Sequence, residues 1–98
     1  MDDILLKRIL SEDGRVLRYP TKLKQRVYAV DYIARKFENK VYNEREVNAV
    51  IRRWIEFADY VLIRRDLVDY GYLSRKNDGS EYRLAETLPT PEDVLAKY

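Results

Sequence analysis

The chain has 98 residues, enough for one domain with a single hydrophobic core but too few for a catalytic domain beside a second domain. It contains no cysteine and no histidine, which excludes disulfides, zinc fingers, thiol nucleophiles, histidine-based triads and nearly every transition-metal site. Charged residues make up 37% of the chain but the net charge is only +2, so this is not a strongly basic polynucleotide-binding protein.

We therefore expect a single domain over residues 1–98 that holds neither a metal nor a cofactor. The N-terminus has no apolar run long enough for a signal peptide, and no later stretch approaches the length of a membrane span. We expect no membrane association and a cytoplasmic location. Basic residues exceed acidic ones in residues 1–58, and the reverse holds in residues 59–98, so any attraction for an anion is expected in the first part.

The N-terminal residues predict an arm that packs on the rest of the domain. Apolar residues within residues 3–10 have the spacing of a short amphipathic helix, and the sequence Ser-Glu-Asp-Gly at residues 11–14 predicts a turn. Residues 15–19 have the pattern of a short strand, and Pro20 favours extended geometry in the residue before it.

The strongest periodic signal predicts a long helix from about Thr21 to Phe37. One apolar stripe recurs along its whole length and consists of Leu23, Val27, Val30, Ala34 and Phe37. Four cations gather at the start of this helix, where the positive end of the helix dipole disfavours them by a few tenths of a kcal/mol each. They are Arg18, Lys22, Lys24 and Arg26. Two interpretations stay open: an anion or phosphate site that uses free helix N–H groups, or a plain solvated face.

A second helix is predicted to begin at Asn43, because Asn43 and Glu46 form an N-x-x-E capping pattern after a connector of residues 38–42. Its apolar residues, which should pack on the first helix, are Val47, Val50, Ile51 and Trp54. We interpret Trp54 as a core anchor, and only secondarily as a stacking platform for bases.

A third helix is predicted from Asp59, an N-cap residue type, to Tyr70, after which Gly71 permits a left-handed turn. The inward face holds Tyr60, Ile63, Leu67 and Tyr70, and the outward face holds Val61, Arg65, Val68 and Asp69. In a helix-turn-helix this helix would enter the major groove of DNA. Asp66 and Asp69 would repel phosphates or neutralise the arginines, so a protein-contact surface or coverage by the N-terminal arm explains the mixture at least as well.

Residues 72–75 and 81–84 flank an Asp78-Gly79 turn and predict a two-strand hairpin. Thr90 as N-cap and Pro91 at the first helical position predict a short closing helix that docks on the body. The expected fold class is α+β: a winged helix-turn-helix-like three-helix core with a C-terminal two-strand β-hairpin and packed N- and C-terminal arms.

Three segments together resemble the bacterial domain-of-unknown-function family 2087, over about residues 15–84. They are residues 18–26 (RYPTKLKQR), residues 41–48 (VYNEREVN), and residues 62–73 (LIRRDLVDYGYL) with residues 78–83 (DGSEYR). Asn43 stands where the family tends to have Thr or Ser, and Ile63 replaces a Leu; both exchanges are conservative. The resemblance implies a winged-helix-like fold and an association with transcriptional regulators, but no established activity.

The matched motif also draws attention to Arg64, which sits at the border of the buried face of the third predicted helix. The resemblance suggests a partly buried ion pair, with Asp59 or Glu46, that fixes the helix angle. A buried arginine without a partner would be strongly destabilising. A ligand or phosphate contact is the alternative for this residue.

Two functions stay open. The first is a domain that binds nucleic acid weakly through phosphate contacts from Arg45, Arg65, Arg75 and Lys76. The alternative is a protein-interaction or ligand-sensing module, including a homodimer, that does not bind DNA directly. No enzyme is expected, because only Asp, Glu, Lys and Tyr could serve as bases and none has a spacing that indicates catalysis.

Overall fold

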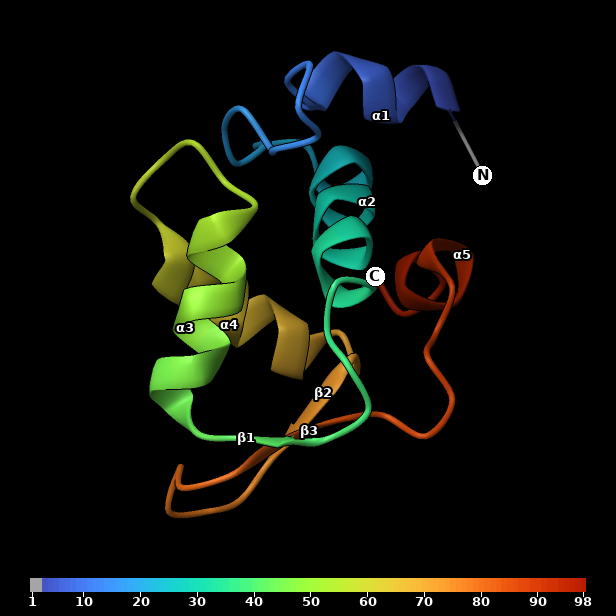
Figure 1. Cartoon of the computed structure of the whole chain (residues 1–98). Coiled ribbons are helices and arrows are strands. Elements are labelled where there is room, and N and C mark those ends of the chain that lie inside the picture. The colour runs from blue at the N-terminus through green and yellow to red at the C-terminus, as the bar shows by residue number, and fades with distance from the viewer. Residues whose placement is uncertain (1–2) are drawn as a thin grey trace.

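The computed structural model describes residues 3–98, which form an α+β structure of five helices and a three-stranded antiparallel sheet (Figure 1). The elements in chain order are α1 (Asp3–Ile9), α2 (Leu23–Ala34), β1 (Val41–Tyr42), α3 (Glu44–Arg53), α4 (Tyr60–Asp69), β2 (Leu73–Arg75), β3 (Tyr82–Leu84) and α5 (Pro91–Leu95). In Figure 1, α1 lies across one end of the molecule and the sheet lies at the other. No helix within these residues is long and apolar enough to cross a membrane.

The sheet has the order β1-β3-β2, so it contains three strands where the sequence predicted two. β2 and β3 form the expected hairpin, with Ser74 opposite Arg83, and β1 adds a third strand on the far side of β3, with Tyr42 opposite Tyr82. β1 has only two residues and lies in the segment predicted to be a connector. A strand this short shows no period-2 alternation, which is why the sequence pattern did not reveal it.

Helix α2 forms the centre of the core. Val27, Val30 and Ala34 of the predicted stripe are fully buried, and Phe37 is nearly so. The helix is shorter at both ends than the predicted range, and Leu23, now its first residue, remains 40% exposed.

Helices α3 and α4 pack against each other beside α2. The predicted capping box of α3 is present: the Asn43 side chain accepts a hydrogen bond from the Glu46 backbone (2.8 Å), and the Glu46 side chain accepts one from the Asn43 backbone (2.9 Å). Trp54 follows α3 as its C-cap residue and is only partly buried. It meets the Tyr32 ring edge to face, with 6.5 Å between centroids, at the boundary of the core.

The inward face of α4 is as predicted: Ile63 and Leu67 are fully buried and Tyr70 is 5% exposed. Gly71 follows with a positive φ of 91°, as the predicted left-handed turn requires. A residue with a side chain would be strained at this φ. Asp59 occupies the N-cap position, as predicted, but its side chain caps no backbone N–H.

The N-terminal segment is packed, but residues 15–19 do not form the predicted strand. Only Val16, which is fully buried, forms isolated bridges, one antiparallel to Leu10 and one parallel to Ile55. The Arg15 side chain donates a hydrogen bond to the Arg53 carbonyl (3.1 Å) and so satisfies an acceptor at the end of α3. The segment is held by single bridges and by this side chain instead of by a ladder.

Helix α5 begins as predicted. Thr90 accepts a hydrogen bond from the Asp93 backbone (3.1 Å), and Asp93 accepts one from the Thr90 backbone (3.0 Å), with Pro91 at the start of the helix. Val94 is fully buried, and α5 packs against α2 (Figure 1).

Candidate nucleic-acid interface

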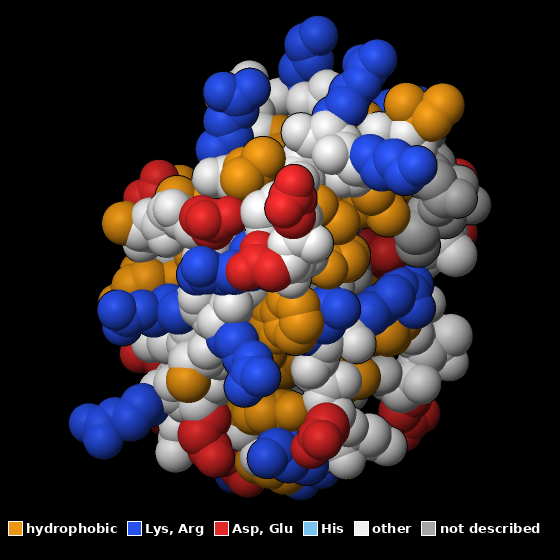
Figure 2. All heavy atoms as spheres, turned by 45° about the horizontal axis from the view of Figure 1, so that its top comes forward, with side chains coloured by type: hydrophobic (Ala, Val, Ile, Leu, Met, Phe, Trp, Pro, Cys, Tyr) orange, Lys and Arg blue, Asp and Glu red, His pale blue; other side chains and the backbone are white. Residues whose placement is uncertain are grey.

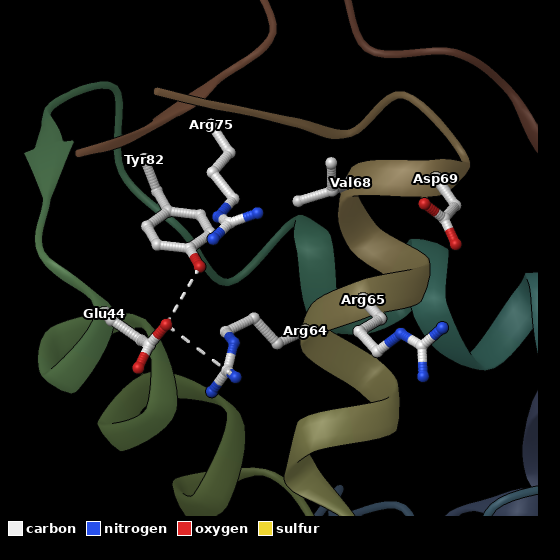
Figure 3. A pocket seen from close by; sticks show the side chains of 7 residues that line it. All are labelled: Glu44, Arg64, Arg65, Val68, Asp69, Arg75 and Tyr82. Carbon is white, nitrogen blue, oxygen red and sulfur yellow. Dashed lines mark hydrogen bonds and ion pairs between the residues drawn. The ribbon is translucent and has the colours of Figure 1, made fainter. Parts of the chain in front are cut away.

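A hollow of about 330 Å³ lies between α4, the first turn of α3 and the β2–β3 hairpin (Figure 3). It is the place where the outward face of α4 meets the hairpin. Its lining contains three arginines and two carboxylates, and consists of Glu44, Arg64, Arg65, Val68, Asp69, Arg75 and Tyr82. The hollow therefore brings together two of the four predicted phosphate-contact residues, Arg65 and Arg75.

Arg64 is held inside the fold. Its Nη1 donates a 2.6 Å hydrogen bond to Asn48 Oδ1, and its Nη2 lies 3.8 Å from Glu44 Oε1. The side chain is 17% exposed. A structural ion pair was expected, but the predicted partners, Asp59 and Glu46, were wrong.

Helix geometry explains this partner choice. Glu44 and Asn48 are four residues apart and share the face of α3 that meets α4. Glu46, in contrast, uses its carboxylate to close the capping box of its own helix. The sequence signal that could have identified the real partners is this i, i+4 pair of an acid and an amide.

Glu44 is engaged from a second side. The Tyr82 hydroxyl of β3 donates a hydrogen bond of 3.3 Å to Glu44 Oε1, the oxygen that also faces Arg64 (Figure 3). One carboxylate thus links α3, α4 and the hairpin. It also offsets part of the positive charge of the hollow.

Arg65 and Arg75 are the unpaired cations of the hollow. The ion pairs found within residues 3–98 involve Arg35, Arg64 and Lys76, so neither side chain belongs to one. Both are exposed. The Arg75 guanidinium lies beside Gly79 in the hairpin turn, and its charge, after the hydrogen bonds from Ser80, helps to lower the pKa of Asp78. In Figure 3, Arg75 extends over Tyr82, whereas the Arg65 guanidinium points away from the hairpin, on the same side of α4 as Asp69. The two guanidinium groups are therefore placed for separate anionic groups.

The other two predicted phosphate contacts lie elsewhere. Lys76 Nζ forms an ion pair with Glu81 Oε2 at 2.7 Å, which holds the pKa of Glu81 below its usual range. The Lys76 ammonium group is therefore paired within the hairpin. Arg45 is exposed and lines a separate hollow of about 380 Å³ beside Glu44, with Arg52 among its neighbours.

The four predicted anion-site residues do not form one site. Arg26 Nε donates a hydrogen bond to the Pro20 carbonyl (3.1 Å), and its guanidinium lies 4.6 Å from the centroid of the Tyr19 ring. Lys22 and Lys24 are exposed, and Lys22 occupies the N-cap position of α2 without a side-chain capping bond. Arg18 alone among the four lines a groove, at the α1 end of the molecule.

The sequence did not reveal the contact between Tyr19 and Asp66. The Tyr19 hydroxyl donates a hydrogen bond to the carboxylate of Asp66, which joins the N-terminal segment to α4. Burial and this acidic partner raise the pKa of Tyr19. Asp66 thus contacts the N-terminal segment, and it forms no ion pair with Arg65 within residues 3–98, although the charge pattern had suggested one.

Within residues 3–98, no group of three or more Asp and Glu side chains is placed to hold a metal ion.

Comparison with known proteins gives a match to a protein family. The model of a family described as "Uncharacterized protein conserved in bacteria (DUF2087)" matches residues 15–84. No curated protein and no solved structure matches the chain.

Proposed function

For this chain, which belongs to the DUF2087 family of bacterial proteins, we propose a winged helix-turn-helix domain of transcription regulation that binds nucleic acid weakly through phosphate contacts. The element order α2-β1-α3-α4-β2-β3 and the strand order β1-β3-β2 support this proposal. In such a domain α2, α3 and α4 are the three-helix core, α4 is the helix that approaches DNA, and the β2–β3 hairpin is the wing.

The observation that carries the proposal is the unpaired state of Arg65 and Arg75 on either side of the hollow between α4 and the hairpin. One cation comes from the helix and the other from the wing. Because their guanidinium groups point in different directions (Figure 3), they suit successive phosphates of a backbone better than one bound anion. Arg45, from the exposed side of α3, adds a third contact.

The same geometry supports weak binding without sequence readout. Glu44 and Asp69 are part of the hollow and oppose the approach of phosphates. Arg64 and Lys76 are engaged in ion pairs, and the exposed face of α4 has no amide side chain that could read an adenine. Three phosphate contacts correspond to a slope of about −3 in a plot of log affinity against log salt concentration.

Fluorescence anisotropy with a labelled duplex DNA at low salt tests this directly. We expect binding at about 50 mM salt that weakens about twenty- to a hundredfold by 200 mM. Duplexes of unrelated sequence should bind equally, because the contacts are to the backbone. Absence of binding at about 50 mM salt contradicts the proposal.

A specific observation also favours the alternative, a protein-interaction module. Val61 and Leu62, in the first turn of α4, are each 42% exposed, beside the charged residues of the same helix. Small apolar areas with a polar surround are typical of non-obligate interfaces. Sedimentation over a range of concentrations tests self-association through this surface, which Val61→Lys should abolish; a monomer at all concentrations rules out the homodimer.

A further inference from the structure

A groove of about 810 Å³ is lined by residues of α1 and of the segment that leads into α2. In Figure 1 these elements lie at the end of the molecule away from the hairpin. The end of α1, the extended segment before α2 and the first turn of α2 form its walls. Its lining consists of Arg8, Ile9, Leu17, Arg18, Tyr19, Pro20, Thr21 and Gln25. None of these residues lies in the hollow between α4 and the hairpin, so the groove is a separate feature.

The groove combines an apolar surface with two cations. Ile9 and Pro20 are buried, and Leu17 exposes 46% of its surface beside them. Arg8 and Arg18 are exposed, and neither belongs to an ion pair within residues 3–98. The face that Figure 2 turns forward has Lys and Arg side chains gathered toward its upper edge, with hydrophobic side chains among them.

The charge of this lining is one-sided. No Asp or Glu is among the described residues of the groove, whereas four further hollows on the surface each include at least one carboxylate. An exposed leucine and two arginines without an ion pair in the same lining leave apolar area in water and positive charge without an acidic partner. A ligand with an apolar body and one anionic group would satisfy both.

We propose that this groove binds a small anionic amphiphile, a carboxylate with an aliphatic body. The carboxylate lies between the guanidinium groups of Arg8 and Arg18, whose paired N–H donors match its two oxygens. The aliphatic body lies along Leu17 and Pro20. Thr21 and Gln25 supply polar side chains at the edge of the site.

The aromatic ring in the groove argues against a nucleotide or single-stranded nucleic acid as the ligand. Tyr19 stacks on Phe57, with centroids 6.0 Å apart and an interplanar angle of 20°, and the Arg26 guanidinium lies over the same ring. A base would need an open ring face for stacking. The Tyr19 ring is instead used within the fold.

Decanoate is a suitable probe, followed through the backbone amide NMR signals of the whole chain below its micelle concentration. We expect concentration-dependent shifts at residues 17–19, at Thr21 and at Arg8, and none at residues 72–84. Decylamine and decanol, with the same chain length and a positive or neutral head, should produce much smaller shifts. A single change, Arg18→Gln, should weaken decanoate binding about fivefold, and Arg8→Gln with Arg18→Gln should abolish it.

Arg53→Gln is the matched control for Arg18→Gln. Arg53 is exposed and lies outside the groove, and its replacement removes the same single charge. This variant should bind decanoate as the unchanged protein does. The proposal is overturned if decanoate causes no shifts at residues 17–19 and Thr21, if decylamine causes equal shifts, or if the double variant binds as well as Arg53→Gln. All of these variants change exposed side chains, and their amide spectra also report whether the fold is retained.

Discussion

Tyr72 donates a hydrogen bond of 2.9 Å to Asp31 Oδ1, although the two residues are 41 positions apart in the chain. Asp31 lies in the middle of α2 and is 1% exposed, and Tyr72 directly precedes β2 and is fully buried. Arg35, one turn after Asp31, donates to both carboxylate oxygens at 3.1 Å. This buried carboxylate ties the central helix to the start of the hairpin, and burial with the charge of Asp31 raises the pKa of Tyr72.

Replacing Asp31→Ala should lower the free energy of unfolding by about 2 kcal/mol, because the buried Tyr72 hydroxyl loses its acceptor. Urea denaturation followed by circular dichroism measures this loss. Tyr72→Phe should cost less, since Asp31 keeps its bonds to Arg35. In the double variant the cost should be smaller than the sum, because no buried hydroxyl remains; strictly additive costs would contradict the contact.

Tyr70 should make stability fall at alkaline pH. Burial, then the negative charge of Asp66, raises the pKa of Tyr70 from 10.0 to about 12. The folded state thus holds this proton more firmly than the unfolded state does. Its contribution is fully present below pH 10 and is lost as the pH rises through about 12. Above pH 10 the unfolding free energy should fall less steeply with pH in Tyr70→Phe, by the slope that corresponds to about one bound proton. An unchanged slope would contradict the raised pKa of Tyr70.

The partners of Arg64 should contribute unequally. Asn48→Ala removes a 2.6 Å charge-assisted hydrogen bond to a mostly buried guanidinium and should cost about 2 kcal/mol of unfolding free energy. Glu44→Gln removes a longer contact from a carboxylate that is 49% exposed, and should cost under about 1 kcal/mol. Thermal or urea unfolding of both variants decides the order, and the reverse order would show that the ion pair dominates.

Releasing Lys76 should strengthen DNA binding. Glu81→Gln removes the carboxylate that pairs with Lys76 at 2.7 Å and leaves a free cation on the hairpin. We expect higher affinity and a steeper salt dependence by about one unit of slope. Glu86→Gln is the matched control, since Glu86 is exposed and belongs to no ion pair within residues 3–98. Equal effects of the two changes would show that only net charge matters.

The periodic and capping signals predicted the helices well because both arise within a few residues of sequence. Val27, Val30 and Ala34 are buried as their spacing requires, and the Asn43 and Thr90 caps form as their patterns indicate. Features that depend on tertiary contact were missed. β1 pairs with the edge of β3, and its two residues, Val41 and Tyr42, are too few to show the alternation that indicates a strand.

The same division applies to the candidate site. The exposure of Arg65 and Arg75 followed from helix period and hairpin geometry. The pairing of Lys76 with Glu81 depends on hairpin register, and the bond from Tyr19 to Asp66 spans 47 positions, so neither could be derived from local pattern. Such long-range pairs decide which cations remain available.

The central claim is that α4 and the hairpin present phosphate-binding arginines. The most direct test is the slope of log DNA affinity against log salt concentration for the unchanged protein, Arg65→Gln, Arg75→Gln and the control Arg53→Gln. We predict that Arg65→Gln and Arg75→Gln each reduce the slope by about 0.9, and that Arg53→Gln leaves it unchanged. Equal slopes for all four proteins, or no measurable binding by the unchanged protein at low salt, would contradict the account.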